Sequence, residues 1–149
     1  MKDIHRKFLN KSIEVLKNLH FKPEDIMVTG SVALDLHGIL PEGRYAHDLD
    51  FVIKMDDQTW RCLKLIEAIY NEDVDEKAML YPERKNTVFL PVNGFMMNIW
   101  KYNNGDWSSI KDEETGIYVA TVEHIIQAKK MYCRPKDYQD INAIVKNLL

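Results

Sequence analysis

The chain has 149 residues, of which 46% are hydrophobic and 29% charged, and its formal net charge is -3. These values exclude the disordered, collagenous and disulfide-scaffold classes, and the length predicts a single domain over residues 1–149 with one sizeable core. The mild negative charge argues against broad electrostatic adhesion to nucleic acid or to an anionic membrane.

The N-terminus and the cysteines bear on where the protein resides. The chain is charged from its second residue, lacks the apolar core of a signal peptide, and contains no apolar run as long as a membrane span. Cys62 and Cys133 have neither CxxC spacing nor a neighbouring His cluster, so neither a zinc site nor a disulfide is indicated. We therefore expect a cytoplasmic protein with no membrane partner and with buried free thiols.

Helical and strand-like patterns alternate in the first half of the chain. Amphipathic spacing indicates helices, short apolar runs indicate strands, and Pro and Gly mark the breaks between them. Ser31 is placed to cap a short helix that Gly38 would end, and Asp56 or Asp57 is placed to cap the next one. In chain order the pattern predicts a helix at 3–20, a strand at 25–30, a helix at 31–38, a loop at 40–47, a strand at 48–54 and a helix at 56–71.

Strand-like runs dominate the next part of the chain, and two helices end it. Asn93-Gly94 is a hairpin signal between two of the runs, and Pro135 separates the helices. The pattern predicts strands at 77–81, 86–92 and 95–102, a long polar surface loop at 103–116, a strand at 117–121, and helices at 122–133 and 136–149. This order predicts an α+β fold with a mixed β-sheet of about five strands, flanked by helices and followed by C-terminal helices.

Two aspartates at a strand start are the first chemical signal. Side chains alternate along a strand, so Asp48 and Asp50 lie on one face, where they can bind a hard cation such as Mg²⁺. An isolated Asp-x-Asp is more often a solvated strand start, and Gly-Ser before a helix is more often a plain cap. Here, however, Gly30 and Ser31 lie where the preceding strand passes into a helix, a position that suits phosphate. The combination favours a phosphate and metal site.

This combination resembles the nucleotidyltransferase superfamily related to DNA polymerase beta. The stretch TGSVALDLHGILPEGRYAHDLDFVI resembles, more narrowly, the opening motif of the AbiEii-type and lincosamide-modifying branches, although the gap between Ser31 and Asp48 exceeds that of the tightest superfamily members. The matching positions are Gly30, Ser31, Ala33, Leu34, Leu36, His37, Gly38, Arg44, Asp48 and Asp50. A second match, TVEHIIQAKKMYCRPKDYQDI, resembles the helical segment of the same branch at Glu123, Lys129, Arg134, Lys136, Asp137 and Asp140.

The resemblance implies a nucleotidyltransferase fold that binds a nucleoside triphosphate with Mg²⁺ or Mn²⁺. It implies that Gly30, Ser31, Arg44 and Lys129 bind the nucleotide and that Asp48 and Asp50 are the catalytic, metal-binding carboxylates. The reaction would transfer a nucleoside monophosphate to an acceptor hydroxyl on a small molecule, a tRNA or a protein. The chain is short, so a homodimer would be one way to complete the acceptor site.

One position departs from the family pattern. Active members carry a third carboxylate on a later strand, and this chain has Asn98 there, a weak metal ligand that cannot accept a proton. The alternative is therefore a catalytically impaired binding or regulatory module, such as a toxin–antitoxin component. A loop carboxylate is a second possible replacement, from Asp106, Asp112, Glu113 or Glu114. Trp100 shares the strand face of Asn98, where core packing is favoured over stacking on a base.

Overall fold

The computed structural model describes residues 1–70, 86–105, 107–132 and 134–148. Its described elements are α1 (Asp3–Asn18), a 3-10 turn (Pro23–Asp25), β1 (Ile26–Thr29), α2 (Gly30–Leu36), β2 (Asp48–Ile53), α3 (Asp57–Tyr70), β3 (Thr87–Val92), β4 (Phe95–Lys101), β5 (Ser109–Lys111), β6 (Tyr118–Ala120), α5 (Val122–Tyr132) and α6 (Pro135–Leu148). The strand expected at 77–81 lies outside the described residues.

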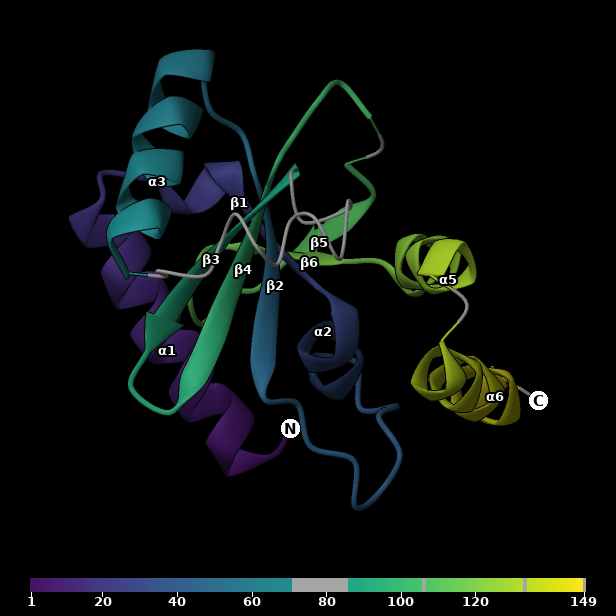
Figure 1. Ribbon diagram of the computed structural model, residues 1–149. Coiled ribbons are helices and arrows are strands. Elements are labelled where there is room, and N and C mark those ends of the chain that lie inside the picture. Colours follow the sequence, from purple (N-terminus) through teal and green to yellow (C-terminus); the bar gives the residue numbers. More distant parts are fainter. Residues whose placement is uncertain (71–85, 106, 133, 149) are drawn as a thin grey trace.

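The strands form one mixed sheet in the order β3-β4-β2-β1-β6-β5, so the expected α+β fold is confirmed (Figure 1). β2 pairs antiparallel with β1 and parallel with β4, while β1 pairs parallel with β6. The predicted hairpin is also confirmed, because β3 and β4 pair antiparallel across Asn93-Gly94, where Gly94 has a φ of 91°. Six strands are described where about five were expected.

β5 corrects the prediction of a long loop over residues 103–116. It pairs antiparallel with β6 and places Ile110 opposite Val119. Its side chains are polar or exposed, and even Ile110 is 59% exposed, because the strand lies at the edge of the sheet. A short edge strand without a buried face carries no hydrophobic alternation that the sequence could reveal.

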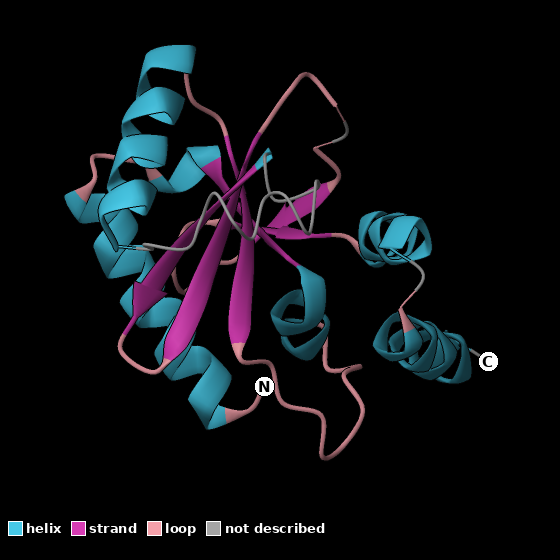
Figure 2. Cartoon of the chain, in the orientation of Figure 1, coloured by secondary structure: helices cyan, strands magenta, loops and turns pink. Residues whose placement is uncertain are grey.

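The central strands bury one face of the sheet completely. Their side chains on that face, which have at most 7% exposure, are Leu49, Phe51, Ile53, Phe95, Met97 and Ile99. Phe8 of α1 stacks on Phe95 at a ring distance of 4.4 Å, so α1 packs against this face as its predicted apolar stripe requires. Figure 2 shows the helices on both sides of the sheet, with α2, α5 and α6 away from α1 and α3. The opposite face of β2 and β4 therefore presents the polar side chains.

α3 follows its predicted pattern at its start and departs from it at its end. Thr59 N–H donates to Asp56 Oδ1 at 2.7 Å, which confirms the predicted cap. At its end, however, the apolar side chains Ile69 and Tyr70 are 74% and 67% exposed. Cys62 on this helix is also exposed, which corrects the expectation of a buried thiol. Among the described residues, no helix combines the length and apolar character needed to cross a membrane.

The ends of α2 show how its residues position the site. Gly38 ends the helix as predicted: its φ is 75°, its N–H donates to the Asp35 carbonyl, and the Ile39 N–H donates to the Leu34 carbonyl. Ser31 was expected to cap the helix, but α2 begins one residue earlier and its cap position is Thr29, which makes no side-chain cap bond. The Ser31 hydroxyl is thereby available to residues outside the helix.

Candidate functional site

Asp48, Asp50 and Asn98 converge on the polar face of β2 and β4. The parallel register pairs Asp50 with Asn98, so the later strand does supply the third position, as the sequence analysis predicted. Asn98 Nδ2 donates to Asp48 Oδ2 and to Asp50 Oδ1, at 2.9 Å in both cases. The amide group thus lies between two carboxylates and partly offsets their mutual repulsion.

The environment of Asp50 disfavours its charge. Burial, followed by the neighbouring Asp48 carboxylate, raises the pKa of Asp50 from 3.8 to about 6, although the Asn98 hydrogen bond and the charges of Lys129 and Lys136 act in the opposite direction. A cation bound beside Asp50 would therefore stabilise the charged form of this carboxylate. Lys136 was grouped with the two aspartates of α6 from the sequence, and its charge acts here on Asp50.

Gly30 brings the turn between β1 and α2 against the carboxylates. Its φ is 69°, and a Cβ atom at this position would lie 2.3 Å from Asp50 Oδ2. Any side chain would therefore displace Asp50, and only glycine is compatible with both the backbone conformation and the close approach. The choice of glycine at this position thus has a direct geometric basis, and Thr29 pairs with Asp50 in the sheet beside it.

A carboxylate of α6 connects the other predicted nucleotide-binding residues. Asp140 Oδ2 accepts from Lys129 Nζ at 2.8 Å, from Arg44 Nη2 at 3.3 Å and from Ser31 Oγ at 3.5 Å, while Arg44 Nη2 also donates to Ser31 Oγ at 3.2 Å. Asp140 is 0% exposed and Lys129 is 6% exposed. We call Ser31, Arg44, Lys129 and Asp140 the clasp, since they join α2, the loop before β2, α5 and α6 (Figure 1).

Asp137 extends the clasp by one turn of α6. Burial alone would raise the pKa of Asp137, but the hydrogen bonds from the Arg134 side chain and backbone hold that pKa below its ordinary value. Asp137 Oδ1 also lies 3.6 Å from Lys129 Nζ. Lys129 of α5 therefore forms ion pairs with two carboxylates of α6, Asp137 and Asp140.

Of the four loop carboxylates considered as replacements, two pair with α1. Asp112 and Glu114 pair with Arg6 of α1 at 3.6 and 3.2 Å, and Asp106 lies outside the described residues. Within the described ranges, no group of three or more His, Cys, Asp or Glu side chains is placed to hold a metal ion. Two carboxylates and one amide are therefore the donor set that the described part of the chain offers.

A buried histidine beside the site was missed by the sequence analysis. His5 is 0% exposed, its Nδ1 lies 2.7 Å from Asp35 Oδ2, and its Nε2 lies 2.9 Å from the Ala46 N–H. Because Nε2 accepts the Ala46 N–H, Nδ1 carries the proton and donates to Asp35. His5 thereby connects α1, α2 and the loop that leads to Asp48. No spacing signal marks this contact, since the three residues are far apart in sequence.

The environment of Trp100 also differs from its expectation. Core packing was favoured, but Trp100 is partly exposed and lies outside the hydrophobic core of the described residues. Of the histidines, His37 lies 2.7 Å from the Ala120 carbonyl oxygen through Nε2, and His47 is exposed.

Asp48, Asp50 and Asn98 can present three oxygen atoms to a divalent cation once the Asn98 amide is rotated. Asn98 Oδ1 is buried and has no hydrogen-bond partner among the described residues. A half-turn of the amide exchanges its nitrogen and oxygen and directs Oδ1 toward the two carboxylates, an arrangement that repels unless a cation lies among the three oxygens. Hard cations such as Mg²⁺ take carboxylate and amide oxygens, so the three residues fit such an ion.

No protein-family model matches the sequence, and no curated protein matches it.

Proposed function

We propose that this chain is a nucleotidyltransferase-like protein that binds a nucleoside triphosphate together with Mg²⁺ or Mn²⁺. The observation that carries the proposal is the convergence of Asp48, Asp50 and Asn98 beside Gly30, whose missing side chain leaves the turn in contact with Asp50. Asp48, Asp50 and a rotated Asn98 would hold the cation. When bound, the cation would neutralise phosphate charge and polarise the phosphoryl group.

Different residues of the chain would then bind different parts of the nucleotide. Gly30 and Ser31 would receive the phosphates, with the positive charges of Arg44 and Lys129 behind them. In nucleotidyl transfer, the acceptor oxygen attacks the α-phosphorus, the bond from that phosphorus to pyrophosphate breaks, and the hydroxyl proton passes to water or to one of the two carboxylates. Asn98 cannot take this proton. We therefore expect Asp48 and Asp50 to be the catalytic carboxylates and transfer to be slow.

A second candidate follows from the same amide. Asn98 donates to both carboxylates, so the pair is held together without a cation and without a third negative charge. A catalytically impaired protein with a nucleotidyltransferase fold, used as a binding or regulatory module such as one partner of a toxin–antitoxin pair, would need only this metal-free arrangement of the two carboxylates. The acceptor of an active enzyme would be a small molecule, a tRNA or a protein, with a homodimer as one way to complete its site.

The test of nucleotide binding is isothermal titration of the full chain with ATP, GTP, CTP and UTP in Mg²⁺ or Mn²⁺. We expect at least one nucleotide to bind and Asp48→Asn or Asp50→Asn to weaken it at least about tenfold, since each removes a charged metal ligand. Asp3→Asn, which changes an exposed carboxylate of α1, is the matched control. Absence of binding, or binding that both site variants retain, rules the proposal out.

The substitution Asn98→Asp separates the enzyme from the silent module. The parent and the variant are incubated with labelled nucleoside triphosphates and cell extract, and the label is followed into RNA, protein and small molecules. Transfer by the variant but not by the parent supports the module, because it restores a missing carboxylate. Strong transfer by the parent removes the module from consideration.

A further inference from the structure

The site face of β4 continues past Asn98 as an apolar surface. Asn98 and Trp100 point to the same side of the strand because they are two residues apart, about 6.6 Å along it. The parallel register places Val52 beside Trp100 and Met96 beside Asp48, and these three apolar side chains are partly exposed. On the opposite face the same strands are fully buried. On this face of the sheet, the two carboxylates therefore lie next to partly exposed apolar side chains.

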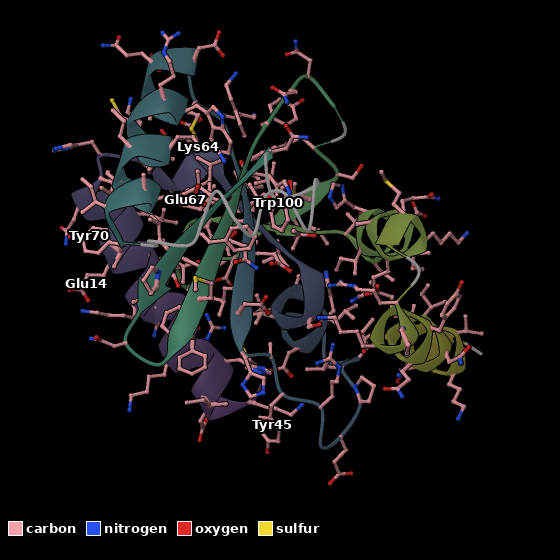
Figure 3. All side chains as sticks on the ribbon, viewed as in Figure 1. Glu14, Tyr45, Lys64, Glu67, Tyr70 and Trp100 are labelled. Atoms are coloured by element: carbon pink, nitrogen blue, oxygen red, sulfur yellow. The ribbon has the colours of Figure 1, made fainter. Side chains whose placement is uncertain are left out.

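Trp100 differs from the other two tryptophans. Trp60 and Trp107 pack against the hydrophobic core, Lys64 Nζ lies 5.5 Å from the Trp60 ring centroid, and Lys54 Nζ lies 4.2 Å from that of Trp107. Within the described part of the chain, Trp100 neither belongs to the core nor stacks on a ring or a cation. Figure 3 shows Trp100 over the middle of the sheet. The described fold thus gives the partly exposed Trp100 ring no aromatic or cationic partner.

The arrangement of charge gives the orientation of a ligand on this face. The groups suited to phosphate, Ser31 and Arg44, lie on the α2 side of the carboxylates, while Trp100 lies beyond Asn98 on β4. The Lys101 side chain points to the other side of β4 and pairs with Asp57 at 2.6 Å. A nucleotide whose phosphates lie at Gly30 and the carboxylates would therefore extend its nucleoside along β4.

We propose that Trp100 is the base-stacking residue of the nucleotide site, with the planar ring of the nucleobase against its indole. This inference rests on the proposed function and adds to it the place of the base. Stacking on an indole tolerates every base, because each base has a π-face. The site accordingly binds a ligand with a base more tightly than one without a base, and it discriminates little among the bases. Purine nucleotides bind somewhat more tightly than pyrimidine nucleotides because their rings are larger.

The experiment compares a nucleotide with a ligand that has no base. The full chain and its Trp100→Ala, Trp100→Phe and Trp60→Ala variants are titrated with ATP and with inorganic tripolyphosphate, both in Mg²⁺, after circular dichroism has shown that each variant is folded. We expect Trp100→Ala to weaken ATP binding about 5- to 100-fold and to leave tripolyphosphate binding within about twofold. Trp100→Phe should retain most of the affinity, and Trp60→Ala should change neither ligand.

Each other outcome contradicts the proposal in a distinct way. Equal weakening of ATP and tripolyphosphate by Trp100→Ala would mean that the indole only supports the fold around the carboxylates. Unchanged ATP affinity would mean that the ring receives something other than the base, such as an aromatic acceptor. If the parent binds neither ligand, the proposed nucleotide site fails as well. The first two outcomes overturn the stacking role and leave nucleotide binding in place.

Discussion

Gly30 sets the distance between the turn that joins β1 to α2 and the carboxylates. It combines a positive φ with an approach to Asp50 that no side chain permits. Gly38, at the other end of α2, has a similar φ of 75° but no atom within 4 Å of the position that a Cβ would take. A substitution at Gly38 would therefore strain the backbone alone, whereas a substitution at Gly30 would strain the backbone and also push against Asp50.

Alanine substitution at both glycines tests this difference. Gly38→Ala should cost about 1–2 kcal/mol of stability, the price of a left-handed residue with a side chain. Gly30→Ala should cost more, and it should also weaken nucleotide binding, because the new methyl group displaces the Asp50 carboxylate. Urea unfolding and nucleotide titration of both variants measure the two effects. Equal stabilities with unchanged binding would show that Asp50 moves aside at no cost.

Asp50 should make stability depend on pH in the direction opposite to an ordinary carboxylate. Its pKa is about 6 in the folded protein, against 3.8 for the unperturbed group, so the folded state holds the proton more tightly than the unfolded chain. Its contribution is then greatest below about pH 4 and falls as the pH rises to about 6, by an amount on the order of 3 kcal/mol.

Asp50→Asn should remove this fall. In EDTA, the variant should be more stable than the parent near pH 7 and no more stable than the parent near pH 4, since the amide keeps the shape without the charge. Urea unfolding across this range is the measurement. Asp57→Asn, which changes an exposed carboxylate, is the control and should show no such gain. A constant difference between parent and Asp50→Asn at all pH values would contradict the assignment.

At the scale of elements, the clasp attaches the two C-terminal helices to the sheet. Asp140 is buried with the charged groups of Lys129 and Arg44 against one of its oxygens, and its other oxygen has no partner among the described residues. A buried ion pair adds little net stability compared with a well-packed apolar pair, but removing one partner leaves the other charge unpaired in the interior. Orientation of α6 is therefore the main contribution of the clasp.

A double-mutant cycle measures this coupling. Lys129→Met and Asp140→Leu should each lower the free energy of unfolding by up to about 3–5 kcal/mol, because each removes the shortest ion pair of a buried charge and leaves only Arg44 against Asp140 or Asp137 against Lys129. The double variant should lose clearly less than the sum of the two, since neither charge remains. Chemical unfolding of the four proteins gives the coupling free energy. Additive losses would show that the 2.8 Å contact does not hold the helices together.

His5 acts between elements in a similar way. It accepts the Ala46 N–H and donates to Asp35, and Asp35 also accepts the Lys2 N–H at 2.8 Å. Burial alone would raise the pKa of Asp35, but the hydrogen bonds from Lys2 and His5 lower it below its ordinary value. The start of α1 is thus fixed to α2 and to the loop that carries Arg44 and leads to Asp48.

For the whole molecule, we expect one cooperative unfolding transition. Ile125 of α5 and Ile144 of α6 are both 0% exposed and belong to the same core as the strands. Tryptophan fluorescence reports on Trp60, Trp100 and Trp107, none of which lies in α5 or α6, while far-ultraviolet circular dichroism includes those helices. The two urea transitions should coincide. Earlier loss of the dichroism signal would reveal a C-terminal pair that unfolds separately, contrary to the single domain expected from the chain length.

The sequence predicted those features that periodicity and local capping determine. The mixed sheet, the hairpin at Asn93-Gly94 and the shared face of Asp48 and Asp50 follow from alternation and turn chemistry. The pairing of Asn98 with Asp50 was anticipated from the family resemblance and follows from the register of β2 and β4.

The remainder depends on contacts between distant segments. β5 has no buried face, so no pattern marks it. The partners of His5 and Asp140 lie 30 or more residues away, apart from Lys129, and no local rule relates such positions. Tryptophan is a residue type that often packs in a core. Only the three-dimensional packing on each face of the sheet shows that the described core does not include Trp100.

The amide of Asn98 has a consequence for how the protein depends on its surroundings. Its N–H groups link the two carboxylates from within the chain, so the fold does not require a dissolved ion to hold them together. With a carboxylate in its place, three negative charges would share one buried corner, and the stability of the apoprotein would follow the free Mg²⁺ concentration. The natural residue should therefore make the stability of the apoprotein depend less on the Mg²⁺ concentration than a carboxylate at this position would.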